Sequence, residues 1–356
     1  MWNKLPGNSV PWTVRLSRCH PLALPMHIGS YAAPFDVYQY ITNEDDACSM
    51  CVGMRASDMI LMGYTKRVIG DHMIKLVLSD MDNTLVPFGR EHVSQRTIDA
   101  IHACQEQGVD FGPTTGRDRA ELASFFRGDR SCYNTAVCAN GQKVYYLRSL
   151  IFERNLESEP LGRAARYVQS LPGCAFITYR SDGLGDWVGI TREEMGSMYD
   201  RAFMAGGVYH DELPVYPVAK AGIICLDGQD AIDRLQVKLE GDYPEFSFTN
   251  SVANWFDISI RGWTKVEGIR ELVATLRLSL DEVCVFGDAD NDLTMLEYIP
   301  NSCAMANAND NAKAAARWHV GASEDDGVAI ALEQIAEAAR LCNESGREDI
   351  MPEFMH

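Results

Sequence analysis

The segment Lys75–Leu85 (KLVLSDMDNTL) constrains this chain most, because an apolar run ends there in two aspartates. The run Leu76–Leu78 is typical of a buried parallel strand, and Asp80 and Asp82 follow its carboxyl end. In open α/β sheets, ligands bind at this edge of the sheet. Two neighbouring carboxylates repel each other unless a cation or a shared proton relieves them, so packing alone does not explain them. The segment therefore predicts a buried strand and a reactive site that starts at Asp80.

Strands and helices alternate through much of the chain, which predicts a parallel sheet covered by helices. The expected strand Met73–Ser79 is followed by a helix that Ser94 caps and then by a second strand, Val109–Thr115. Pro113 in this second strand lacks the amide hydrogen that a central strand needs, so the strand fits a sheet edge or a bulge better. The fold class we expect is α/β, with a Rossmann-like, doubly wound parallel sheet.

The middle of the chain breaks this alternation. Between residues 159 and 250 the expected order of helices and strands changes, which indicates a separate α+β module. The strands expected there are Ala175–Tyr179, Trp187–Ile190, Ala221–Cys225 and Phe246–Asn250, with Trp255–Ile260 as a further strand. The parallel pattern resumes after Ile260 with an amphipathic segment and then an apolar strand, Glu282–Phe286.

Two segments carry groups suited to binding an anion. Thr115 and Gly116 stand between an expected strand and an expected helix, where a hydroxyl and free backbone N–H groups make an anion site. A threonine cap followed by glycine is also common without any ligand. Lys265 opens an amphipathic helix, a position where a lysine is usually a solvated surface residue. Neither segment alone specifies a function.

The segment Gly287–Asp292 (GDADND) directly follows the apolar strand and carries three acids and an asparagine. Carboxylate and amide oxygens in such a cluster are typical of a site for a hard cation. The simpler alternative is an acidic cap on the next helix, where an aspartate in the first turn is favourable. Since one such acid is enough for a cap, three beside a buried strand favour the metal site.

Composition limits the partners of this protein. The formal net charge of −18 argues against nucleic acid or an anionic membrane as a partner. It also requires that an anionic substrate be received by a local cationic site. The sequence contains no uninterrupted apolar stretch of about 18 residues, so we expect no membrane helix. The start of the chain lacks the apolar core of a signal peptide. The eleven scattered cysteines are typical of reduced thiols, so we expect a cytoplasmic protein.

Taken together, four segments resemble the motifs of the haloacid dehalogenase-like hydrolase superfamily. Asp80–Thr84 is similar to its first motif, DxDxT, and Thr115 to its second. Lys265 is similar to the third motif, and Gly287–Asp292 to the fourth, GDxxND. The module between the second and third motifs has the size and place of the α/β cap in the Cof-type sugar-phosphatase branch. The resemblance covers about residues 73–340.

The resemblance implies a Mg²⁺-dependent phosphatase that hydrolyses small phosphomonoesters, with sugar phosphates as the main class, through an aspartyl-phosphate. Asp80 would be the nucleophile, and Asp82 would be the general acid and then the general base. Mg²⁺ would be held by Asp80, by the backbone carbonyl of Asp82 and by Asp288. Thr115 and Lys265 would hold the phosphate oxygens on which the transition-state charge is spread.

The remaining site residues that the resemblance implies support the substrate phosphate, the metal's water shell or the catalytic loops: Asn291, Asp292, Gly116, Thr84 and Asn140. We expect Thr84 to steady the loop of Asp82, and Asn140 to lie near the substrate entrance. Specificity is expected to come from the cap, where the polar or aromatic candidates are Arg180, Asp182, Trp187, Lys220 and the loop Ser181–Asp186.

The same resemblance divides the chain into a poorly ordered N-terminal extension, two parts of a core, an inserted cap and a tail: residues 1–72, 73–158 and 251–341, 159–250, and 342–356. The expected partner is a small phosphorylated metabolite. Two alternatives stay open, a phosphosugar mutase of the same fold and a non-catalytic phosphometabolite-binding protein. A dehalogenase is disfavoured because Asp82 supplies an acid and base that carbon–halogen chemistry does not need.

Overall fold

The structure is a computed structural model, and it describes residues 73–181, 183–202, 206–347 and 349–356. The predicted N-terminal extension, residues 1–72, and the cap candidate Asp182 lie outside the described residues, so the expectations about them stay predictions. In the described ranges, no helix combines the length and the apolar character needed to cross a lipid bilayer.

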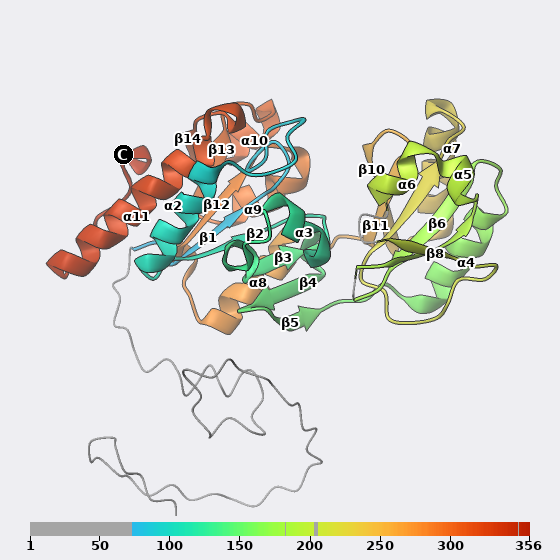
Figure 1. Ribbon diagram of the computed structural model, residues 1–356, viewed down its shortest axis with the longest axis horizontal. Helices are drawn as coiled ribbons and strands as arrows, with labels where there is room; N and C mark the ends of the chain where they lie inside the picture. The colour runs from blue at the N-terminus through green and yellow to red at the C-terminus, as the bar shows by residue number, and fades with distance from the viewer. Residues whose placement is uncertain (1–72, 182, 203–205, 348) are drawn as a thin grey trace, which may run out of the picture. The chain divides into compact units, whose positions relative to one another are not determined.

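A five-stranded parallel sheet forms the centre of the core (Figure 1). Its strands, in spatial order, are β14 (Trp318–Val320), β13 (Asn301–Met305), β12 (Val283–Gly287), β1 (Leu76–Ser79) and β2 (Asp110–Pro113). In the parallel register, Ser79 at the end of β1 lies opposite Phe286 of β12 and Pro113 of β2. The residues that follow these three neighbouring strands therefore lie at one edge of the sheet, where the predicted motifs lie.

The position of β2 confirms the expectation from Pro113, because β2 is the edge strand of this sheet. Beyond it lies a three-stranded antiparallel sheet of β3 (Ala136–Cys138), β4 (Lys143–Tyr146) and β5 (Ser149–Glu153). The backbone N–H of Thr115 donates to the carbonyl of Val137 at 2.8 Å, so the chain leaving β2 is fixed to β3.

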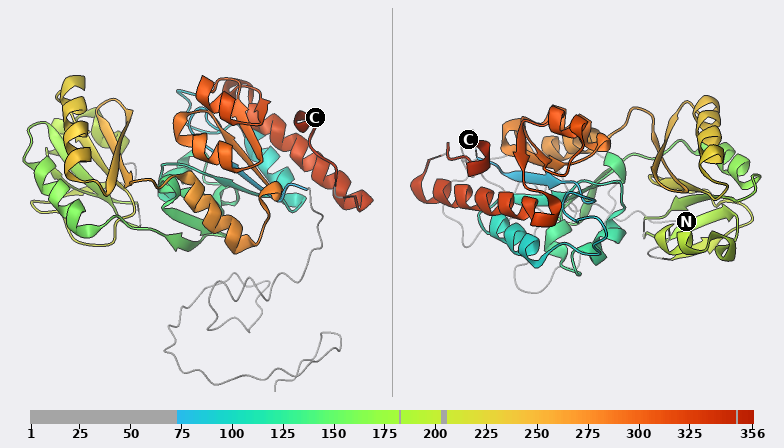
Figure 2. Two further views of the ribbon diagram at one scale, coloured as in Figure 1. Left: turned by 180° about the vertical axis from the view of Figure 1, so that it is seen from behind. Right: turned by 90° about the horizontal axis from the view of Figure 1, so that it is seen from above.

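Helices cover the parallel sheet, as the alternating pattern predicts. They are α2 (Gln95–Glu106), α3 (Arg119–Phe125), α8 (Lys265–Leu276), α9 (Leu293–Tyr298), α10 (Asp310–Ala315) and α11 (Gly327–Ser345). Ser94 caps α2 by accepting a hydrogen bond from the backbone N–H of Thr97, which confirms the predicted helix start. Helices α2 and α11 lie side by side, as Figures 1 and 2 show. The core is thus an α/β, Rossmann-like fold.

Short 3₁₀ turns connect several of these elements: η1 (Arg130–Tyr133), η2 (Ala139–Gly141), η3 (Leu280–Glu282), η4 (Asp290–Asp292), η5 (Ser323–Asp325) and η6 (Glu353–Met355). The last of them lies in the predicted tail and packs on the core. The ring of Phe354 lies 6.4 Å from that of Phe286, and its backbone N–H donates to Gln334. The tail therefore contributes to the packing around β12.

A second, six-stranded sheet forms the cap. Its spatial order is β10 (Phe246–Val252), β11 (Trp255–Ile260), β9 (Ala221–Cys225), β6 (Cys174–Tyr179), β7 (Gly185–Gly189) and β8 (Gly207–Tyr209). Four helices accompany it, α4 (Ser158–Gln169), α5 (Arg192–Met195), α6 (Ser197–Ala202) and α7 (Gln229–Asp242). One buried cluster contains Phe176, Phe246 and Phe256, and a second contains Trp187 and Trp255, so apolar side chains are buried in two separate groups.

The second sheet extends further along the sequence than the predicted division allows. Strands β10 and β11 form an antiparallel hairpin in which Phe246 lies opposite Ile260, and β11 also pairs with β9. The predicted boundary after residue 250 therefore lies too early, because the residues up to Ile260 belong to this sheet. A boundary at residue 250 divides the hairpin of β10 and β11, whose two strands stabilise each other by backbone hydrogen bonds.

Helix α8 packs closely against η2, and this contact depends on Gly268. A Cβ atom at Gly268 would lie 2.7 Å from the Cα of Gly141 and 2.7 Å from a methyl group of Val137. These distances are shorter than side chains tolerate, and one neighbour is backbone that has little room to move. The missing side chain therefore sets how close α8, with Lys265 at its first turn, lies to β3.

We expect Gly268→Ala to lower the free energy of unfolding by about 1–3 kcal/mol, the usual cost of overpacking a core. Gly241→Ala is the matched control, because Gly241 is also helical and a Cβ atom there meets nothing within 4 Å. This control should be neutral or slightly stabilising. Chemical denaturation of both variants measures the difference, and equal stability of the two would contradict the close packing of α8.

Candidate active site

The centre of the site is a buried contact between Asp80 and Lys265. Asp80 directly follows β1, is 6% exposed, and its backbone N–H donates to Phe286 at 2.9 Å. Lys265 is 1% exposed, and its Nζ donates to Asp80 Oδ1 at 2.5 Å and to Asp292 Oδ1 at 2.7 Å. The structure therefore places Lys265 inside the site, and the alternative of a solvated surface lysine is wrong.

A capping box at the start of α8 positions Lys265. Thr264 precedes the helix, and both its backbone N–H and its hydroxyl donate to Glu267 Oε2 at 2.7 Å. The backbone N–H of Glu267 in turn donates to the carbonyl of Thr264 at 3.2 Å, and together these bonds fix the first turn of the helix. Because β11 ends at Ile260, only a short link joins the cap sheet to the lysine of the site.

Burial disfavours the charged forms of both Asp80 and Lys265. Burial raises the pKa of Asp80, and the Asp292 and Asp288 carboxylates raise it further, while the Lys265 ammonium lowers it. Burial works against the charge of Lys265, but the carboxylates of Asp292 and Asp80 hold its pKa above the usual range. Lys265 is thus a cation, and it does not by itself compensate the carboxylates around it.

Asp288 follows β12 at the same sheet edge and completes a carboxylate cluster. It is 7% exposed, and burial raises its pKa to about 6, although a hydrogen bond from Thr84 opposes this shift. Thr84 Oγ1 donates to Asp288 Oδ1 at 2.8 Å, so Thr84 ties the loop after β1 to the fourth motif. The expected support of the Asp82 loop by Thr84 stays a prediction.

Three carboxylates meet in this cluster. One oxygen each of Asp80, Asp288 and Asp292 lies within 4.8 Å of the others. Asp292 Oδ2 accepts from the backbone N–H groups of Asp288 and Ala289 at 2.9 and 3.2 Å, and its other oxygen accepts from Lys265. Both oxygens of Asp292 are thus occupied, so it orients Lys265 and the fourth-motif loop. Asp80 and Asp288 are the carboxylates better placed to bind a cation.

These residues fit Mg²⁺ by their chemistry. Mg²⁺ prefers hard oxygen ligands, and the two available carboxylates supply them. Burial, together with the neighbouring carboxylates, raises the pKa of both Asp80 and Asp288 and so disfavours their charged forms. A divalent cation beside both carboxylates would offset this effect.

Asp82 lies outside the buried cluster in the described structure. Its side chain is 56% exposed and is held by Arg117, whose Nε and Nη2 donate to the two carboxylate oxygens at 3.0 and 2.7 Å. Arg117 is not among the residues predicted for the site. The position of Arg117 directly after Thr115 and Gly116 could have indicated a site residue. Its partner Asp82, however, lies 35 residues earlier in the chain, so a local pattern does not reveal the pairing.

The second motif, Thr115 and Gly116, lies beside Asn140, the residue expected near the substrate entrance. Thr115 is 1% exposed, its Oγ1 accepts from the backbone N–H of Arg117 at 3.2 Å, and its carbonyl accepts from the backbone N–H of Asn140 at 3.0 Å. A Cβ atom at Gly116 would lie 3.1 Å from Asn140 Oδ1, so glycine leaves room for that amide. Asn291 lies in η4 and is exposed.

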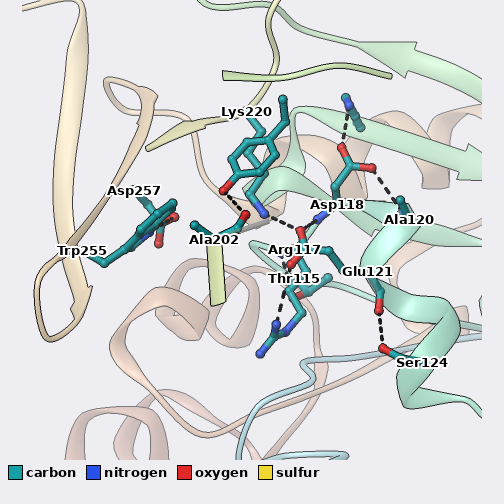
Figure 3. Close-up of polar contacts among 12 residues, drawn as sticks. Thr115, Arg117, Asp118, Ala120, Glu121, Ser124, Ala202, Lys220, Trp255 and Asp257 are labelled. Atoms are coloured by element: carbon teal, nitrogen blue, oxygen red, sulfur yellow. Dashed lines mark hydrogen bonds and ion pairs between the residues drawn. The ribbon is translucent and has the colours of Figure 1, made fainter. Parts of the chain in front are cut away.

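An ion pair connects this part of the core to the cap, as Figure 3 shows. Lys220, just before β9, donates to Glu121 Oε1 at 2.5 Å, and Arg117 Nη1 lies 3.7 Å from Glu121 Oε2. Burial opposes the charge of Glu121, but Lys220 lowers the pKa of its carboxyl below the usual value. Lys220, one of the cap candidates, thus contacts the core beside the second motif.

The other described cap candidates are placed differently. Trp187, named as one of several specificity candidates, is 4% exposed within an apolar cluster, and its Nε1 donates to the carbonyl of Ile190. These contacts place it in the packing of the cap. Asp186 is 1% exposed and accepts from Tyr216 at 2.9 Å. Arg180 Nη1 lies 3.7 Å from Asp186 and stays partly exposed.

The chain matches the family model of haloacid dehalogenase-like hydrolases over residues 77–332 and therefore belongs to this family. Its Cof-type assignment from the motifs is confirmed. A relative from Haemophilus influenzae, provisionally named a phosphatase, is 26% identical over 74% of this chain and 98% of its own length. An HMP-PP phosphatase of Escherichia coli is 26% identical over 66% of this chain and 85% of its own length.

Solved structures show the same fold. A haloacid dehalogenase-like hydrolase from Bacteroides thetaiotaomicron is 22% identical, covers 74% of this chain and 99% of its own, and has a TM-score of 0.62. A HAD subclass IIB sugar phosphatase is 20% identical, covers 76% and 99%, and has a TM-score of 0.57. These structures confirm the predicted Rossmann-like core with a cap.

We expect Asp292→Ala to lower the free energy of unfolding by about 3–5 kcal/mol, because it leaves a buried lysine with one carboxylate fewer. It also removes the acceptor of two backbone N–H groups. Glu297→Gln, an exposed change on α9, should stay within about 0.5 kcal/mol of the parent protein. Denaturant unfolding compares the two variants, and a similarly small effect of Asp292→Ala would refute the positioning role.

Proposed function

We propose that this protein is a Mg²⁺-dependent phosphatase that hydrolyses small phosphomonoesters, sugar phosphates foremost, through an aspartyl-phosphate. The observation that carries the proposal is the buried Asp80 at the end of β1, held at 2.5 Å by Lys265 and beside Asp288. Lys265 orients this carboxylate for attack and supplies positive charge beside it. The phosphatase names of the two curated relatives support the same reaction.

Asp80 would attack the phosphorus atom in line with the leaving oxygen, forming the carboxyl–phosphoryl bond as the ester bond breaks. Lys265 fixes the orientation of Asp80 and supplies positive charge beside the non-bridging oxygens. The hydroxyl and backbone of Thr115, at the neighbouring strand end, are suited to the same oxygens. Bound Mg²⁺, held by Asp80, Asp288 and the carbonyl of Asp82, would offset the repulsion between the carboxylates and the phosphate dianion.

Asp82 would donate a proton to the leaving alkoxide and later remove one from the water that hydrolyses the aspartyl-phosphate. In the described structure Arg117 holds both oxygens of this carboxylate. The proton transfer therefore requires that one of these hydrogen bonds be exchanged for one to the substrate or to water. Arg117, through Glu121, contacts the cap residue Lys220, so cap position and the freedom of Asp82 are linked.

A panel of phosphate esters tests the proposed substrate class. The relatives suggest two classes, HMP-PP from the Escherichia coli enzyme and sugar phosphates from the subclass IIB structure. Release of free phosphate from sugar phosphates in Mg²⁺ would support the proposal. Conversion of a hexose 1-phosphate into an isomer without phosphate release would show a mutase instead, and inactivity across the panel would indicate a binding protein.

Replacing the proposed nucleophile gives the sharpest test. We expect Asp80→Asn to reduce hydrolysis by at least about 10³-fold, since removing a covalent nucleophile removes the stepwise route. Asp99→Asn, the same change at an exposed position of α2, should leave turnover unchanged. Initial rates of phosphate release measure both, and turnover of Asp80→Asn within tenfold of the parent protein would rule out the aspartyl-phosphate.

Removal of the metal is the second test. Excess chelator should abolish activity and added Mg²⁺ should restore it, because the two available carboxylates are ligands that Mg²⁺ prefers. Asp288→Ala should weaken Mg²⁺ binding by about tenfold or more, which calorimetry measures without reference to turnover. Full activity in chelator, or unchanged Mg²⁺ affinity in Asp288→Ala, would contradict the proposed metal site.

A further inference from the structure

A cavity of about 360 Å³ lies on the core beside α3, among residues to which the proposed reaction assigns no role. Its polar and aromatic lining comes from α3, η1, β4, the turn after β4 and one cap residue: Arg119, Arg130, Tyr133, Tyr145, Arg148 and Ser181. Three arginines thus converge on one hollow of a chain whose formal net charge is −18. A cationic cavity in an acidic protein favours an anionic ligand.

The acid in the lining does not neutralise these arginines. Asp118 belongs to the cavity wall, but its Oδ2 accepts from Lys143 Nζ at 2.6 Å, and both side chains are 2% exposed. Its Oδ1 accepts from the backbone N–H of Ala120, which caps α3. Asp118 is therefore committed to a buried lysine and to a helix start. The positive charge of the cavity remains uncompensated by this carboxylate.

Arg119 supplies a polar group that lacks a partner. Its guanidinium lies over the ring of Tyr145 at 5.0 Å and over that of Tyr133 at 5.8 Å. Its Nε is buried and makes no hydrogen bond among the described residues. Ring faces attract a cation but do not accept the N–H in a conventional hydrogen bond, and a buried unsatisfied donor is costly. The guanidinium that carries this donor belongs to the cavity wall, so an anion in the cavity would lie beside its positive charge.

The turn that carries Arg148 is held in an unfavourable conformation. Leu147 and Arg148 join β4 to β5 with φ values of 46° and 74°, in the left-handed region where Asn and Gly are preferred. The backbone N–H of Arg148 donates to the carbonyl of Asn134 at 2.8 Å, which holds the turn against η1. Backbone strain of this kind is frequently found at ligand sites. Here it brings an exposed arginine to the cavity.

We propose that this cavity is a second, non-catalytic binding site for a phosphoryl dianion, either free phosphate or the phosphate group of a small ester. Arg119 and Arg148 donate to the phosphate oxygens, and Arg130 adds charge at the rim. The volume accommodates more than an inorganic ion and lies in the range of small-molecule sites. Asp118 joins the cavity wall to the segment that carries Thr115, so the site borders the second motif without sharing its residues.

The test observes Arg119 directly in the full-length protein. The Nε–H signal of Arg119 in an arginine-labelled NMR spectrum, assigned by its loss in Arg119→Lys, is followed during titration with inorganic phosphate. Separate titrations with glucose 6-phosphate and AMP, in protein freed of Mg²⁺ to prevent turnover, distinguish free phosphate from ester ligands. A saturating shift supports the proposal, and no shift with any of the three probes overturns it.

Variants then separate the cavity from the active site. Arg130→Gln/Arg148→Gln changes two exposed cavity arginines and should weaken phosphate binding, seen at Arg119, by at least about tenfold. Arg127→Gln, an exposed arginine outside the lining, is the matched control and should leave affinity unchanged. Equal affinity in both variants would overturn the site. Because Arg119 is the readout, this outcome does not depend on whether the protein hydrolyses phosphate esters.

Discussion

The buried ammonium of Lys265 is the interaction on which the site depends. It contacts carboxylates that follow two different strands, Asp80 after β1 and Asp292 after β12, while itself standing on α8. A buried charge with a missing partner costs several kcal/mol, so each element is held in place by the other two. The close approach of α8 at Gly268 provides the packing that keeps the ammonium at this depth.

Clustered acids set the second constraint on this protein. The parallel sheet brings the chain after β1 and after β12 to one edge, which concentrates negative charge at the proposed phosphate site. One oxygen of Asp292 is neutralised by Lys265 and the other by backbone N–H groups. The remaining excess charge lies on Asp80 and Asp288. Fold topology therefore brings together the carboxylate of the proposed nucleophile and the carboxylate proposed to bind a cation with it.

The sequence predicted what depends on local pattern. The apolar run before Asp80, the edge position implied by Pro113 and the Ser94 cap each rest on neighbouring residues, and each agrees with the structure. Motif order placed Lys265 in the site although its local pattern indicated a surface lysine. The roles assigned to the site residues remain predictions that the variants above test.

Other features were beyond the reach of sequence because they depend on distant pairing. The contacts of Arg117 with Asp82 and of Lys220 with Glu121 join residues far apart in the chain, and a charge pattern does not specify such partners. Trp187 was named as a candidate because it is aromatic, and residue type carries no signal for which face of a sheet a side chain takes. The predicted cap boundary at residue 250 is wrong because the hairpin of β10 and β11 extends the cap sheet to Ile260. Composition does not reveal this pairing.

The short link from β11 to Lys265 has a consequence for how this enzyme can diversify. A change in the cap that shifts the end of β11 is transmitted through Thr264 to the first turn of α8, and so to the orientation of the buried ammonium. The cap sheet and the lysine of the candidate site are thus connected through one short stretch of backbone. Adaptation of the cap to a new ligand would be expected to require compensating changes around the capping box, so the cap and the capping box would evolve together.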